Sequence, residues 1–269
     1  MHDFFNAIVL GIVEGLTEFL PISSTAHLLV SERLLNLSKE QWEVFTVVIQ
    51  FGAVLSVVVV YWRKFWDVLI GLPSKTSARQ FVINVVVAFL PSALLGVALI
   101  KVINNYLLDP ERALPVIAAS WLLGGIIILF FERIAPPPSY VDSDALPWTK
   151  ALQIGLCQCL ALLPGVSRSG ATILGGELLG VERATAARFT FYLAVPTMLG
   201  ASVFELYKQR AALTHSSLEI IAVGFVVSFL SAWVVVRSFI GFVSRFGLKP
   251  FGWYRIATGL ALAAFIATR

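Results

Sequence analysis

The chain has 269 residues, of which 58% are hydrophobic and only 13% are charged, and its formal net charge is +4. Soluble domains carry roughly 25% charged residues, so the composition excludes a soluble globular protein and predicts a membrane protein that crosses the bilayer several times. The small positive charge gives no reason to expect a nucleic-acid partner. We expect one membrane domain over residues 1–269.

The first half of the chain begins with two short apolar segments, residues 4–20 and 25–37, which are separated by Pro21 and a run of hydroxyl residues. We predict that they form a re-entrant hairpin, which enters the membrane, turns near its middle and leaves on the same side. Three segments that are long enough to span about 30 Å of hydrocarbon follow, at residues 42–62, 81–103 and 114–131.

The second half repeats this order after a polar connector, residues 132–150, which contains three consecutive prolines. The segments 151–163 and 169–179 are separated by Pro164 and Gly165, and we expect them to form a second hairpin. Three further spans are predicted at residues 186–206, 217–236 and 251–267.

Three spans separate the two predicted hairpins, so the hairpins enter the membrane from opposite faces. The predicted fold is therefore all-α, with six transmembrane helices and two re-entrant helical hairpins in an inverted-topology repeat of residues 1–131 and 151–269. Lys and Arg residues are more numerous in the loops opposite both termini. This bias predicts that those loops are cytoplasmic and that both termini lie outside.

Two acidic residues interrupt the first hairpin, since Glu14 and Glu18 are four residues apart and share one helix face. Placing two carboxylates near the bilayer centre costs roughly 5–7 kcal/mol on insertion scales, so opposite charge is needed beside them. Arg168, in the second hairpin, is the natural partner. A divalent cation, Mg²⁺ or Ca²⁺, held by both carboxylates is the predicted cofactor.

Each hairpin restarts its second helix with hydroxyl residues. Hydroxyls, free backbone N–H groups and the positive end of a helix together form an anion site, so these positions are expected to bind the substrate. The expected substrate contacts are Ser23, Thr25, Ser167, Ser169 and Gly170. Gln50, in the first long span, either donates into the same site or packs against another helix.

The first hairpin also supplies the candidate catalytic groups. Ser24 is placed for nucleophilic attack, with His27 and Glu18 as proton handlers. His27 follows Ser24 by about one helical turn, so the two side chains are expected to face the same cavity. The nucleophile stays open between Ser24, His27 and a metal-bound water. With Arg168, these groups indicate a phosphatase that acts on a metal-bridged diphosphate.

At these motifs the chain resembles the bacterial undecaprenyl-diphosphatase family of the bacitracin-resistance type. The resemblance rests on residues 14–27, 164–172 and 191–196 and covers nearly the whole chain. It implies an integral enzyme of the bacterial plasma membrane that converts undecaprenyl diphosphate to undecaprenyl phosphate and phosphate, which recycles the lipid carrier of cell-wall synthesis. The residues to which it assigns roles are Glu14, Glu18, Ser24, His27 and Arg168.

The same resemblance implies dependence on a divalent cation and an active site that opens to the outer, periplasmic face. Membrane lipids and a second copy of the chain, in a homodimer, are the partners that it suggests. A transporter or flippase of polyprenyl phosphate lipids is the alternative function, because inverted repeats with broken helices are typical of secondary transporters. Two acids beside a serine and a histidine favour the enzyme, since anion transport alone does not need them.

Overall fold

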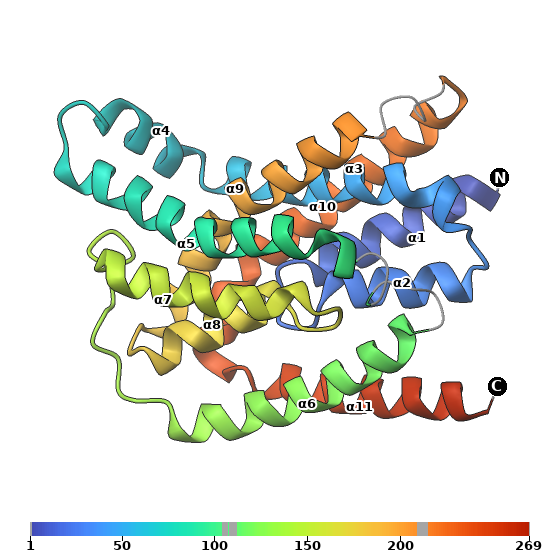
Figure 1. Ribbon diagram of the computed structural model, residues 1–269. Helices are drawn as coiled ribbons and strands as arrows, with labels where there is room; N and C mark the ends of the chain where they lie inside the picture. The colour runs from blue at the N-terminus through green and yellow to red at the C-terminus, as the bar shows by residue number, and fades with distance from the viewer. Residues whose placement is uncertain (1, 104–106, 108–111, 209–214, 269) are drawn as a thin grey trace.

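The computed structural model describes residues 2–103, 107, 112–208 and 215–268, and this part of the chain is built from helices without a β-strand (Figure 1). The helices of the first half are α1 His2–Thr17, α2 Ser24–Leu34, α3 Lys39–Val60, α4 Trp62–Gly71, α5 Thr76–Val102 and α6 Ala113–Ile134. Those of the second half are α7 Trp148–Gln158, the short 3₁₀ helix η2 Cys159–Leu162, α8 Arg168–Leu178, α9 Arg183–Lys208, α10 His215–Phe246 and α11 Lys249–Ala267.

Several of these helices can cross a bilayer. By length and apolarity, three described helices qualify, namely α5, α6 and the stretch Leu218–Phe246 of α10. A fourth span is added if the bent pair Val44–Val60 and Trp62–Gly71 counts as one. Their outward faces are apolar, with Leu94 69% exposed and Val97 74% exposed, as expected for surfaces that contact lipid. The protein is therefore a multi-pass membrane protein, while the count of six spans stays a prediction.

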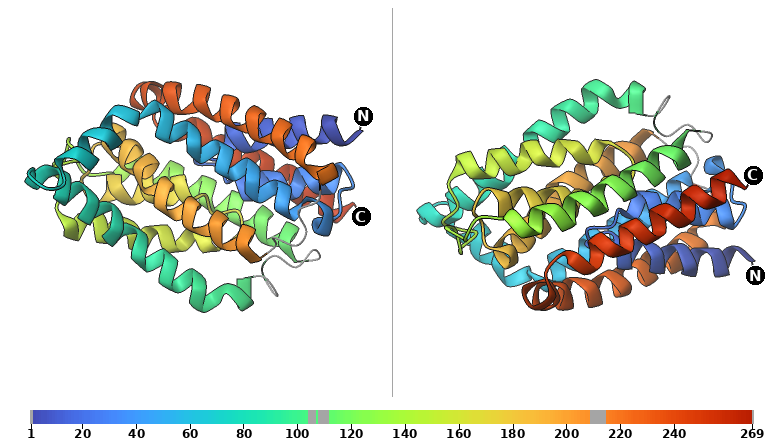
Figure 2. Two further views of the ribbon diagram at one scale, coloured as in Figure 1. Left: turned by 90° about the horizontal axis from the view of Figure 1, so that it is seen from above. Right: turned by 90° about the horizontal axis from the view of Figure 1, so that it is seen from below.

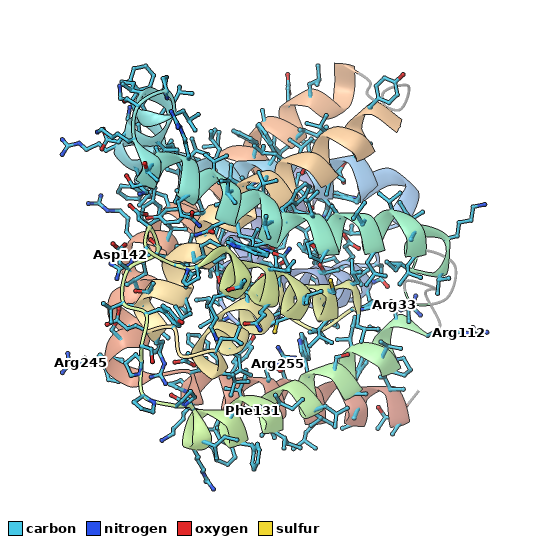
Figure 3. The ribbon with its side chains drawn as sticks, turned by 60° about the vertical axis from the view of Figure 1, so that its left-hand side comes forward. Arg33, Arg112, Phe131, Asp142, Arg245 and Arg255 are labelled. Carbon is cyan, nitrogen blue, oxygen red and sulfur yellow. The ribbon has the colours of Figure 1, made fainter. Side chains whose placement is uncertain are left out.

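The charged residues fit a membrane slab. Arg33 and Arg112 lie at one end of the molecule, and Asp142 and Arg245 lie at the opposite end (Figure 3). Arg255 lies between the two ends, at a depth where a charge is costly unless it is paired (Figure 3). Arg255 therefore needs partners inside the protein that compensate its charge.

Two predicted spans differ from the observed helices. The span predicted at residues 42–62 ends at Val60, and α4 leaves it at an angle of 71°. Lys64 of α4 forms an ion pair with Asp144 of the connector, which holds this bent helix against the rest of the protein. The span predicted at 217–236 is extended to Phe246 in α10, because no proline or glycine turn comes before Gly247, whose φ of 72° ends the helix.

The two short helix pairs approach each other from opposite ends of the molecule, and both chain termini lie at the same end (Figures 1 and 2). Helix α1 packs against α10, and its counterpart α7 packs against α5. Helices α6 and α11 lie side by side, as do α3 and α9. Each pair α1–α2 or α7–α8 is therefore held mainly by long helices of the other half.

Glycines of the repeated sequence pattern allow this close packing. A Cβ atom added at Gly11 would lie 2.8 Å from the Gly224 carbonyl oxygen of α10. One added at Gly155 would collide with the backbone of Ala88 in α5. The two glycines occupy equivalent positions in the two halves, so the repeat in the sequence corresponds to a repeated helix contact.

Candidate active site

The site lies where the first tip, residues 18–23, meets the second tip, residues 163–167. The carbonyl oxygen of Leu20 accepts hydrogen bonds from the hydroxyls of Ser167 at 3.2 Å and Ser169 at 2.7 Å. Ser169 is fully buried, and the Gly170 N–H donates to the Ser167 hydroxyl at 3.1 Å. The structure therefore uses Ser169 and Gly170 inside the tip contact, and they do not line the cavity where we expected substrate contacts.

Arg255 of α11 holds both tips and is absent from the predicted site residues. Its guanidinium donates to the carbonyl oxygens of Ser120 at 2.7 Å, Gly165 at 2.9 Å and Pro21 at 3.3 Å. Because the side chain is 3% exposed, these carbonyls compensate a charge that is buried in the membrane. A lone Arg inside the predicted span 251–267 was a usable sequence signal, since intramembrane charges mark functional sites.

The first tip ends in a strained residue. Ser23 adopts a left-handed backbone with φ 72°, which residues with a Cβ atom rarely do. Its hydroxyl accepts from the Ala26 N–H at 3.5 Å and so caps α2. Strain of this kind gathers at functional sites, where surrounding contacts enforce it. Here it turns the chain so that α2 begins with Ser24.

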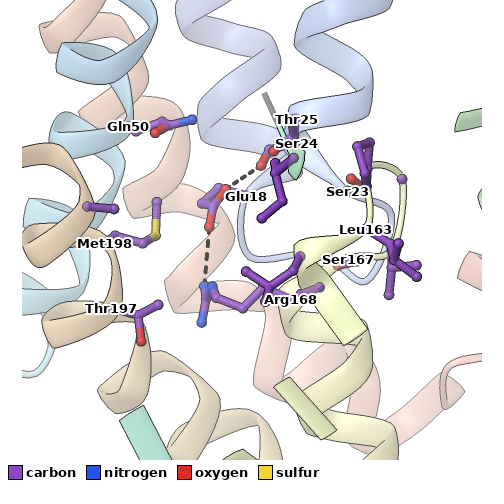
Figure 4. Close-up of a pocket in the computed structure, with 17 residues that line it drawn as sticks. Glu18, Ser23, Ser24, Thr25, Gln50, Leu163, Ser167, Arg168, Thr197 and Met198 are labelled. Atoms are coloured by element: carbon purple, nitrogen blue, oxygen red, sulfur yellow. Dashed lines mark hydrogen bonds and ion pairs between the residues drawn. The ribbon is translucent and has the colours of Figure 1, made fainter. Parts of the chain in front are cut away.

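Three of the four predicted catalytic residues meet in one cavity of about 320 Å³ between the tips (Figure 4). The Ser24 hydroxyl donates to one carboxylate oxygen of Glu18, and Arg168 donates to the other at 3.3 Å. Arg168 also donates to the backbone oxygen of Thr190 in α9 at 3.1 Å, which fixes its direction. Glu18 and Arg168 are 8% and 12% exposed, so this is a desolvated ion pair with a hydroxyl attached.

The remaining walls of the cavity are of two kinds. Ser23, Thr25, Ser167 and Gln50 add polar groups, so Gln50 reaches the cavity as one of its two predicted roles requires (Figure 4). The apolar wall consists of residues of η2, the second tip and the long helices, among them Ile103, Leu162, Met198 and Ala201. The cavity can therefore receive a molecule with a charged end and an apolar chain.

Glu14 lies one turn before Glu18, since the Glu18 N–H donates to the Glu14 carbonyl oxygen at 2.9 Å. The Glu14 side chain is fully buried, and both of its carboxylate oxygens lack a hydrogen-bond partner among the described residues. Buried, unpaired carboxylate oxygens suit a hard cation, so this residue fits the predicted metal site. No group of three or more His, Cys, Asp and Glu residues able to hold a metal occurs in the described part of the chain.

His27 is not in this cavity, which corrects the expectation that it faces the same space as Ser24. It lines a second cavity of about 320 Å³ between α2, α6 and α11, together with Trp121 and Tyr254. Residues three apart lie only about 60° apart around a helix, but Ser24 bonds to Glu18 while His27 bonds to Tyr254 of α11, so the two side chains enter different cavities. The structure thus brings Glu18, Ser24 and Arg168 together in one cavity and places His27 in the other.

Comparison with known proteins identifies the family of the chain. Residues 7–261 match the family described as bacitracin resistance protein BacA. A protein from Rhodopseudomonas palustris named undecaprenyl-diphosphatase is 46% identical over 258 residues, which cover 96% of this chain and 95% of that protein. Proteins of the same name from a Caulobacter species and from Novosphingobium aromaticivorans are each 48% identical, and they match 97% and 100% of this chain and 96% and 100% of their own lengths. The chain therefore belongs to the bacitracin resistance protein BacA family.

Proposed function

We propose that this protein is an integral membrane phosphatase that hydrolyses undecaprenyl diphosphate to undecaprenyl phosphate and phosphate. The observation that carries the proposal is the set of Ser24, Glu18 and Arg168 in one cavity that also has an apolar wall. Family membership and the names of the relatives agree with it. A guanidinium binds phosphate oxygens, a serine can attack phosphorus, and a carboxylate can accept the serine proton.

In the proposed reaction, Arg168 and the N-terminus of α8 hold the terminal phosphate next to Ser24. The Ser24 Oγ atom forms a bond to the terminal phosphorus, and its proton passes to Glu18, which already accepts that hydrogen bond. The bond between this phosphorus and the bridging oxygen breaks, and undecaprenyl phosphate leaves with that oxygen. Water then hydrolyses the phosphoserine, which releases phosphate and restores the Ser24 hydroxyl.

We propose that a divalent cation, Mg²⁺ or Ca²⁺, takes part in this reaction. Glu14 and Glu18 would hold it, because the two Glu14 oxygens are buried without a partner in the described structure. Phosphate and water oxygens would complete its coordination, as is usual for Mg²⁺ at phosphate sites. Bound there, the cation would neutralise the diphosphate charge and polarise a phosphoryl oxygen.

The proposed topology is the inverted repeat with six spans and two re-entrant hairpins in the bacterial plasma membrane. Two observations support it. Both termini lie at the same end of the molecule, and α1 packs on α10 as its counterpart α7 packs on α5. The isoprenyl chain would leave the cavity past Ile103, Leu162 and Ala201, between α5, η2 and α9. The cavity would open to the outer face, and a homodimer stays a prediction that a mass measurement in detergent would check.

The test is phosphate release from undecaprenyl diphosphate by the detergent-purified protein. We expect release that requires Mg²⁺ or Ca²⁺ and falls at least about 100-fold in Glu18→Ala, Ser24→Ala and Arg168→Ala, because each removes a group at the reacting phosphate. Ser244→Ala is the control, since among the described residues this exposed hydroxyl bonds only its own helix, at the Ile240 carbonyl oxygen. Movement of polyprenyl phosphate across vesicles without phosphate release would instead support the transporter, which the Ser24–Glu18 bond disfavours.

A further inference from the structure

The imidazole of His27 is engaged at both nitrogens. Nδ1 lies 2.7 Å from the Ser23 carbonyl oxygen, and Nε2 lies 2.8 Å from the Tyr254 hydroxyl. The ring packs against Trp121, with centroids 4.7 Å apart, and is stacked on Tyr254. The ring, Trp121 and Tyr254 line the second cavity, between α2, α6 and α11, whereas Ser23 lines the cavity that contains Ser24.

The partners fix where the protons lie. The Ser23 carbonyl oxygen can only accept, so Nδ1 carries a hydrogen and donates it. In a neutral imidazole Nε2 is then an acceptor, and the Tyr254 hydroxyl donates to it. Tyr254, His27 and Ser23 thus form one directed chain of hydrogen bonds. Neither ring nitrogen is left to exchange a proton with a phosphate on the other side of the helix.

The last residue in this series of hydrogen bonds is Ser23, the strained residue of the site. Ser23 has φ 72°, and its carbonyl oxygen accepts from the His27 N–H at 3.3 Å as well as from Nδ1. That carbonyl belongs to the peptide group from which Ser24 follows. Its orientation therefore helps to decide the direction in which the Ser24 hydroxyl meets Glu18.

We propose that His27 and Tyr254 are positioning residues, which hold the left-handed turn at Ser23 and so aim Ser24 at Glu18. This inference rests on the proposed phosphatase function, and it replaces the expected proton transfer by His27 with a purely geometric task. Glu18 alone then accepts the Ser24 proton. Arg168 binds the phosphate without help from His27 or Tyr254. Breaking the hydrogen bonds from Tyr254 to His27 and from His27 to Ser23 should therefore lower kcat while leaving KM nearly unchanged.

His27→Asn and His27→Ala separate positioning from proton transfer. The Asn side-chain nitrogen occupies about the place of Nδ1 and can donate to the Ser23 carbonyl oxygen, but it does not titrate. We expect His27→Asn to keep kcat within about tenfold of the unmodified protein, whereas His27→Ala falls about 100-fold because Ser24 is misplaced. The pH profile of kcat/KM should keep the same limbs in His27→Asn.

Tyr254→Phe tests the other end of the chain, with Thr258→Val as its control. Both variants remove one hydroxyl from α11 near the second cavity, but within the described part of the chain the Thr258 hydroxyl bonds only its own helix, at the carbonyl oxygens of Tyr254 and Arg255. We expect Tyr254→Phe to lower kcat by about three- to tenfold, since one hydrogen bond to the ring is lost. Thr258→Val should leave kcat unchanged, and equal rates in the two variants would remove Tyr254 from the proposal.

The outcomes distinguish the two proposals. Activity of His27→Asn with an unaltered pH profile, together with a low kcat and normal KM in His27→Ala, supports positioning. If His27→Asn is as inactive as His27→Ala, or loses a limb of the pH profile, His27 transfers protons and the inference is wrong. Full activity of His27→Ala overturns it as well. If the unmodified protein releases no phosphate from undecaprenyl diphosphate, both this inference and the proposed function fall.

Discussion

Gly124→Ala should damage the active site from a position that lies outside it. Gly124 is in α6, and a Cβ atom added there would collide with the Nη2 atom of Arg255 and lie 2.6 Å from its Cζ atom. Nη2 is the atom that donates to the carbonyl oxygens of Ser120 and Gly165. The added methyl group therefore pushes the guanidinium away from the second tip while the polarity of the chain is unchanged.

The size of the effect follows from the two hydrogen bonds. Bonds to charged groups contribute about 1.5–3 kcal/mol each, so losing both costs about 3–6 kcal/mol. Alanine regains about 1 kcal/mol over glycine inside a helix. The net loss of stability is therefore about 2–5 kcal/mol. A shift of about 1 Å in the second tip, which begins the helix of Arg168, should lower kcat about 100-fold.

Thermal unfolding in detergent and phosphate release from undecaprenyl diphosphate measure the two effects. Gly241→Ala is the matched control, because a Cβ atom at Gly241 meets nothing within 4 Å. It should be neutral or raise stability by about 0.5–1 kcal/mol. Arg255→Lys, alone and combined with Gly124→Ala, checks the cause: once the guanidinium is gone, the extra methyl group should add little further damage. Equal behaviour of Gly124→Ala and Gly241→Ala, or simple additivity with Arg255→Lys, would refute the reasoning.

Three further changes test other parts of the structure. Glu14→Gln should raise the Mg²⁺ or Ca²⁺ concentration needed for half-maximal phosphate release at least about tenfold, because a charged ligand is lost; an unchanged cation titration would remove Glu14 from the metal site. Ser169→Ala should lower stability by about 1–3 kcal/mol in thermal unfolding, since the buried Leu20 carbonyl oxygen loses its shortest hydrogen bond; an unshifted transition would contradict this. Gly155→Ala should lower stability by about 1–3 kcal/mol, because the added methyl group meets the Ala88 backbone. An unchanged unfolding transition would mean that α5 and α7 can move apart without cost, and would contradict the prediction.

The hairpin helices and their tips were predictable from the sequence. Pro21, and Pro164 with Gly165, mark the interruptions: α1 ends at Thr17 and η2 at Leu162, and α2 and α8 begin just after the hydroxyl caps Ser23 and Ser167. The Glu18–Arg168 pair was predictable too, since buried charges of opposite sign in one membrane domain seek each other. These features depend on local residue type and on charge, both of which a sequence displays directly.

The side of α2 on which each residue lies was not predictable in the same way. The φ of 72° at Ser23 sets the direction in which α2 leaves the tip, and a serine gives no warning of such a backbone. As a result, His27 faces Tyr254, which follows it by 227 residues, and Ser24 faces Glu18. Across the tip contact, Ser169 and Arg255 bond backbone carbonyl oxygens, which every residue has, so composition cannot identify these partners.

The distance along the chain between the two sides of the tip contact determines when the site can form during synthesis. Pro21 meets Arg255 only after 234 further residues have been made, and Leu20 meets Ser169 after 149. Until Arg168 has been made, the nascent amino-terminal helices carry Glu18 into the bilayer without the arginine that pairs with it. The first tip therefore cannot settle until nearly the entire polypeptide has been made, and a chain halted ahead of α11 would leave the Pro21 and Gly165 carbonyl oxygens inside the membrane without the Arg255 guanidinium.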